Sequence, residues 1–144
     1  MNDTPKGPAQ DWWRWPLLPF AAVAGALAGS IIAVLFLWFG MKLQGGFSED
    51  GWYFRYVMPV ISSAIFGYLF AHISCEMAPR GKVIAGTVMV TILGLFGLLG
   101  IVLAWIVPDY PVGQAIQATV GTVATMIAAV VTLMDAPSKY RASA

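Results

Sequence analysis

The chain has 144 residues, enough for one ordinary domain, and 59% of them are hydrophobic while only 10% are charged. Soluble domains carry roughly a quarter charged residues, so this composition excludes a typical soluble protein and predicts an integral membrane protein. A formal net charge of +1, without a large basic cluster, gives no support for a nucleic-acid partner. The single cysteine excludes a disulfide within the chain.

Four segments that are nearly free of charge follow one another along the sequence. They cover residues 17–41, 57–77, 83–107 and 112–134. Each meets the requirement of about 20 residues for a helix that crosses a bilayer. We therefore expect an all-α integral membrane protein, with one membrane domain over residues 1–144 and four transmembrane helices in an antiparallel up-down bundle. The small, polar ends at 1–11 and 136–144 are expected to be flexible tails.

The basic residues are divided unevenly between the two sides that this topology creates. Only two lie on the side of the first and third loops, Lys42 and Arg55. The other six lie on the side of the two ends and the second loop: Lys6, Arg14, Arg80, Lys82, Lys139 and Arg141. By the positive-inside rule, this asymmetry predicts a bacterial inner (plasma) membrane protein with both termini in the cytoplasm.

Small residues recur at helical spacing in three of the segments, and such stripes mark helix contacts in membranes. In the first segment they are Ala21, Gly25, Gly29 and Ala33. In the second they are Ser63, Gly67 and Ser74, and in the third Gly97, Gly100 and Ala104. At 100° per residue, the small face of the second segment lies nearly opposite His72, so we expect His72 to point away from the bundle.

The segment 112–134 has one polar or small face and one apolar face. The polar face carries Gln114, Gln117, Gly121, Thr125 and Thr132. These uncharged groups are suited to line a solute path. They are equally suited to hydrogen-bond and pack against neighbouring helices. We favour packing because the segments contain none of the central charged residues that usually mark ion and proton pathways.

The end of the second segment holds the only histidine and the only cysteine of the chain. On a helix, His72, Cys75 and Glu76 share a face, because they stand at positions i, i+3 and i+4. Together with Arg80 they are our candidates for contact with a partner protein or a lipid headgroup. The plainer interpretation is a helix end that meets water. We predict no metal or cofactor, since the segments supply no second histidine to complete a site.

Three classes of function remain open. The first is a non-enzymatic accessory or assembly subunit of a larger membrane complex, which contacts lipid and either other membrane subunits or copies of itself. The second is a homo-oligomeric channel or small-solute transporter lined by the polar face of segment 112–134. The third is a haem or metal protein that uses His72, which a Soret band or bound metal would reveal.

Overall fold

The computed structural model describes residues 14–43, 51–78, 81–108 and 110–142, with side chains from residue 15 to residue 136 within those ranges. The described part is helical and contains no strand. It consists of α1 (Arg14–Leu43), a π-helical turn η2 (Tyr53–Val57), α2 (Met58–Met77), α3 (Lys82–Ile106) and α4 (Val112–Ala142).

The four expected segments are confirmed as helices that are long and apolar enough to cross a membrane. Their membrane-compatible stretches are Trp15–Leu43, Tyr53–Met77, Lys82–Ile106 and Val112–Ala136. The N-terminal tail expected over 1–11 lies outside the described residues. At the other end, α4 continues to Ala142, so the segment expected to be a flexible tail is helical up to that residue.

Proline and glycine set the ends of α2 and α3. Pro59 stands at the start of α2 and has no N–H, so the turn before it cannot keep the usual α-helical bonding. The N–H of Met58 bonds instead to the carbonyl of Tyr53, five residues earlier, which gives the π-helical turn. α2 ends at Met77, and Gly81 takes a left-handed φ of 60° just before α3, a conformation that glycine adopts without strain.

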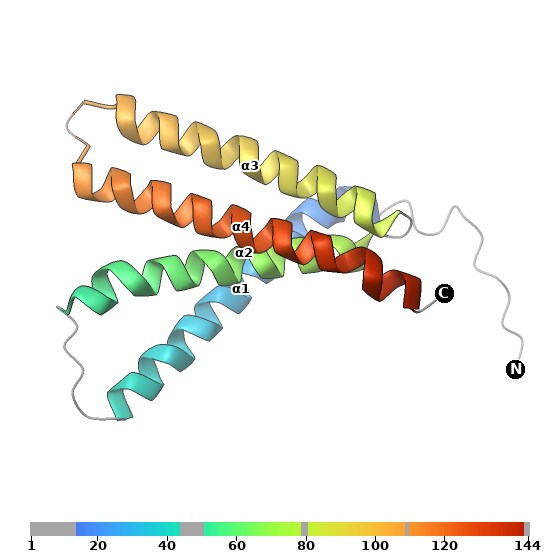
Figure 1. The fold of residues 1–144 in the computed structure, drawn as a ribbon, viewed down its shortest axis with the longest axis horizontal. Helices are drawn as coiled ribbons and strands as arrows, with labels where there is room; N and C mark the ends of the chain where they lie inside the picture. Colours follow the sequence, from blue (N-terminus) through green and yellow to red (C-terminus); the bar gives the residue numbers. More distant parts are fainter. Residues whose placement is uncertain (1–13, 44–50, 79–80, 109, 143–144) are drawn as a thin grey trace, which may run out of the picture.

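The central element of the fold is α2. It packs most extensively against α4 and α1, and also against α3, while α3 packs against α4. Figure 1 shows that α1 crosses α2, so that its second half lies on the opposite side of α2 from α3, and that the four helices are close together near the α2–α3 connection. Toward the other end the helices spread apart, so that α3 and α4 diverge together from α2, and α1 diverges on its own.

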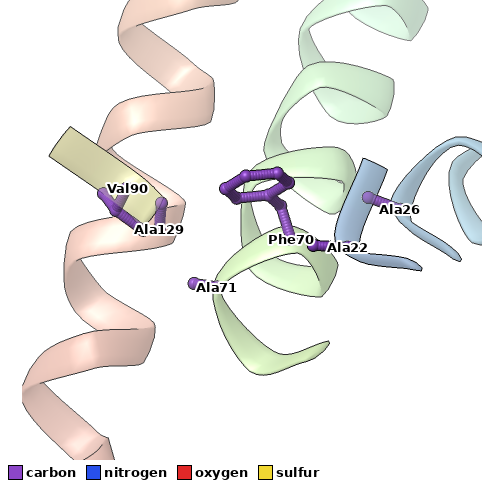
Figure 2. Packing of buried hydrophobic residues seen from close by; sticks show 6 residues of the cluster. All are labelled: Ala22, Ala26, Phe70, Ala71, Val90 and Ala129. Atoms are coloured by element: carbon purple, nitrogen blue, oxygen red, sulfur yellow. The ribbon is translucent and has the colours of Figure 1, made fainter. Parts of the chain in front are cut away.

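A small core lies where the helices are closest. It consists of Ala22, Ala26, Phe70, Ala71, Val90 and Ala129. Figure 2 shows Phe70 of α2 between the alanines of α1 and Ala129 of α4. Four of these six residues are alanine, and small side chains allow the close backbone approach on which helix packing in a membrane depends.

The glycines of the expected small-residue stripes in α1 and α2 are confirmed at helix contacts. In α1, a Cβ on Gly25 would stand 2.6 Å from Cδ1 of Ile73, and one on Gly29 would overlap Leu69. In α2, a Cβ on Gly67 would overlap the backbone carbonyl of Thr125 in α4. α2 therefore uses one face for α1 and another for α4.

Candidate functional site

The end of α2 carries three of the candidate residues, His72, Cys75 and Glu76. The ring of His72 stacks on Tyr68, with centroids 6.0 Å apart and planes inclined by 10°. Glu76 accepts a hydrogen bond from Lys82 at 3.4 Å in an exposed ion pair, a type that contributes about 0–1 kcal/mol. Cys75, in contrast, is only 2% exposed. The three residues therefore do not form one site.

The burial of Cys75 follows from the close approach of α3, because a Cβ on Gly86 would overlap its Sγ atom. The thiol here acts as a small apolar group that fills the space between two helices. Cys75 is thus removed from the candidate surface contacts, which reduce to His72 and Glu76 among the described residues. Arg80, the fourth candidate, lies outside the described residues.

The metal hypothesis gains no further ligands from this geometry. Within the described ranges there is no group of three or more His, Cys, Asp or Glu side chains that could hold a metal ion. The ring contact of His72 is with a tyrosine, which stands one helical turn away on the same helix.

Part of the polar face of α4 packs against α2. The hydroxyl of Thr125 is shared between the carbonyl of Gly121 in its own helix, at 2.9 Å, and that of Ser63 in α2, at 3.0 Å. Gly121 is buried, and a Cβ there would stand 3.0 Å from Oγ of Ser63. For these two residues, the interpretation as a helix contact is confirmed.

Gln117 binds a carbonyl that proline leaves without its usual donor. In a regular α-helix the carbonyl of Arg55 would accept from the N–H of residue 59, which is Pro59 and has none. The side-chain amide of Gln117 donates to that carbonyl at 3.0 Å. Gln117 thereby holds η2 against α4.

Four residues of the polar face, Gln114, Gln117, Gly121 and Thr125, line a cleft of about 620 Å³ where α2 diverges from α3 and α4. The cleft residues are Pro59 and Ser63 from α2; Gly97, Gly100 and Ala104 from α3; and Tyr110, Gln114, Gln117, Ala118, Gly121, Thr122 and Thr125 from the α3–α4 turn and α4. All of these are uncharged. Thr132 lies outside the cleft and donates to the carbonyl of Ala128 in its own helix.

The three hydroxyl groups of serine and threonine in the cleft donate their hydrogens to backbone carbonyls. Ser63 donates to Pro59 at 2.8 Å, Thr122 donates to Ala118 at 2.9 Å, and Thr125 is bonded as described above. A hydroxyl has one hydrogen but two lone pairs, so each of these oxygens keeps acceptor capacity. The walls of the cleft are therefore richer in acceptors than in donors.

The wall formed by α3 was only partly predicted from sequence. The small residues Gly97, Gly100 and Ala104 mark a face, but their spacing does not show that this face lines a cleft opposite Gln114. Gly97 touches α4, since a Cβ there would stand 2.7 Å from Cγ2 of Thr122, whereas a Cβ on Gly100 would meet nothing within 4 Å. The sequence shows the small stripe of α3 and the polar face of α4, but it does not show that the two lie opposite each other.

Comparison of the chain with protein-family models, with curated proteins and with solved structures finds no match. Function is therefore inferred from the geometry of the described residues.

Proposed function

We propose that the chain is a non-enzymatic accessory or assembly subunit of a larger complex in a bacterial inner membrane. Its four spans would cross antiparallel, with both termini in the cytoplasm, as the distribution of lysine and arginine favours. At the opposite boundary, the ammonium group of Lys42 lies 4.6 Å from the ring of Trp38, a pair that suits the headgroup region at the end of α1.

The observation that carries this proposal is the unequal burial of the two halves of α1. The first half contains the buried residues Leu18, Ala22, Ala26 and Ser30. No residue of α1 after Ser30 is buried, and this half diverges from α2 in Figure 1. The second half is therefore open to contact with another molecule in the membrane.

The small-residue stripe of α1 extends into this open half. Gly25 and Gly29 meet α2, whereas Gly40 lies further along the same face, and a Cβ on Gly40 would meet nothing within 4 Å. Small residues let a second helix approach closely, whereas contact with lipid chains does not require small residues. We therefore expect a transmembrane helix of a partner subunit to pack against this half of α1.

The test compares Gly40→Leu with Gly113→Leu, since both glycines are helical and have open space around them. Each protein is purified under gentle conditions from its native membrane, and bound proteins are identified and weighed by native mass spectrometry. We expect wild type and Gly113→Leu to retain a partner at fixed stoichiometry, and Gly40→Leu to lose it. A wild-type protein that purifies alone, or only with itself, would contradict the proposal.

A second function, a homo-oligomeric channel or small-solute transporter, is favoured by the polar cleft. Gln117 and Thr125 are poor positions for testing it, because their hydrogen bonds join α4 to the second span and the loss of those bonds would disturb packing. Gln114 lines the cleft and is exposed, so Gln114→Leu tests flux without removing a helix contact. If wild-type protein carries a small solute into liposomes and Gln114→Leu abolishes this flux, the result supports the function. Equal flux through wild type and variant would refute it.

A further inference from the structure

We infer that the cleft between α2, α3 and α4 is a binding site for an uncharged ligand rich in hydroxyl groups, either a free polyol or sugar or the sugar part of a lipid headgroup. Its volume of about 620 Å³ falls within the roughly 300–1,000 Å³ of typical small-molecule sites. The inference goes beyond the proposed function, because it concerns a different surface from the open half of α1.

The hydrogen-bonding capacity of the cleft selects for donors on the ligand. The hydroxyl hydrogens of Ser63, Thr122 and Thr125 are already given to carbonyls, which leaves their oxygens to accept. One N–H of the Gln117 side chain is donated to Arg55, which leaves its second N–H as a donor and its carbonyl oxygen as an acceptor. A ligand that places several O–H groups in the cleft would satisfy these acceptors together.

Besides Gln117, the cleft contains two side chains that are able to donate. Gln114 and Tyr110 line it and form no side-chain hydrogen bond with another described residue. A hydroxyl group both donates and accepts, so it matches a wall of many acceptors and few donors better than a ligand that only accepts.

The absence of charge among the described cleft residues disfavours ionic ligands. The described residues of the cleft include no Asp, Glu, Lys, Arg or His, so an ionic group that entered would lose water without gaining a counter-charge from them. A neutral polyol avoids this cost. Phosphorylated or carboxylated sugars should therefore bind more weakly than their uncharged parents.

Gly100 gives a direct way to close the site without disturbing the fold. A Cβ at this position meets no atom within 4 Å, so a leucine side chain would project into the cleft instead of into a neighbouring helix. Thr122→Val is a second probe, because it removes one acceptor at nearly constant shape and breaks only a bond within α4.

The experiment uses the full chain in phosphatidylcholine nanodiscs, which contain no sugar headgroups. Binding of glycerol, inositol, glucose and sucrose is measured by saturation-transfer NMR, and a galactosyl diacylglycerol is tested in separate discs by native mass spectrometry. Saturable binding of one soluble compound indicates a free polyol, and binding of the glycolipid alone indicates a lipid headgroup. Either result supports the site if Gly100→Leu weakens binding by at least about tenfold and Thr122→Val weakens it measurably.

Gly40→Leu is the matched control, because it alters the open half of α1 and leaves the cleft unchanged; it should bind like wild type. The site is refuted if none of the five compounds binds, if Gly100→Leu retains wild-type affinity, or if glucose 6-phosphate binds more tightly than glucose. Loss of a protein partner in Gly40→Leu with intact polyol binding would show that the two surfaces act separately.

Discussion

The contact between Gly67 of α2 and Thr125 of α4 offers a graded test of the packing. A methyl group on Gly67 would overlap the backbone carbonyl of Thr125, which cannot rotate away, so the two helices must separate. A methyl group on Gly25 meets only the end of the Ile73 side chain, at 2.6 Å, which can change rotamer. A methyl group on Gly40 meets nothing.

These differences set the expected free energies of unfolding. Overpacking of a close contact typically costs about 1–3 kcal/mol. The separation would also weaken the hydrogen bond from Thr125 to Ser63, worth about 0.6 kcal/mol in a membrane. Replacing glycine by alanine within a helix returns up to about 1 kcal/mol. Gly67→Ala should therefore be about 1–3 kcal/mol less stable than wild type, whereas Gly40→Ala should be equal or slightly more stable.

The assay is reversible unfolding in mixed micelles with increasing mole fraction of dodecyl sulfate, followed by circular dichroism and tryptophan fluorescence. Gly25→Ala should fall between the other two variants, because a flexible side chain absorbs part of the clash. Equal stability of Gly67→Ala and Gly40→Ala would contradict the close approach of α2 and α4 at Gly67.

Two further predictions concern single side chains. Thr125→Val should destabilise the protein by about 0.6 kcal/mol, and at most by about 1.7 kcal/mol, in the same assay. Thr132→Val loses only a bond within α4 and should be close to neutral. Equal effects of the two substitutions would contradict the hydrogen bond between α2 and α4. Cys75, at 2% exposure, should react with N-ethylmaleimide only after unfolding in dodecyl sulfate, whereas the exposed control Ile84→Cys, made in a Cys75→Ala background, should react in the native protein. Comparable native labelling of the two thiols would refute the burial of Cys75.

Hydrophobic runs were sufficient to locate the helices, because a run of about 20 apolar residues has the length and composition of a helix that crosses a bilayer. Helical periodicity also identified faces that pack: Gly25 and Gly67 each lie at a helix contact, as expected. Periodicity assigns a residue to a face of its own helix and carries no information about which neighbour will meet that face.

The features that were not predicted all depend on the placement of one helix relative to another. Cys75 shares a turn with His72, yet the approach of α3 buries the thiol and leaves the histidine partly exposed. The bond from Gln117 to Arg55 joins residues far apart in the chain, although Pro59 in the sequence was a clue that a carbonyl would need another donor. The cleft itself arises from the divergence of α2 from α3 and α4, which no local pattern encodes.

The most direct test of the proposed subunit role is photo-crosslinking in the native membrane from the open half of α1. Benzoylphenylalanine replaces Phe36, which is 74% exposed in that half, and in a matched control it replaces Phe96 of α3, which is 69% exposed. We predict a discrete adduct with one other membrane protein from position 36 and a weaker or absent one from position 96. Adducts with lipid alone, or only with a second copy of this chain, would contradict the proposed role.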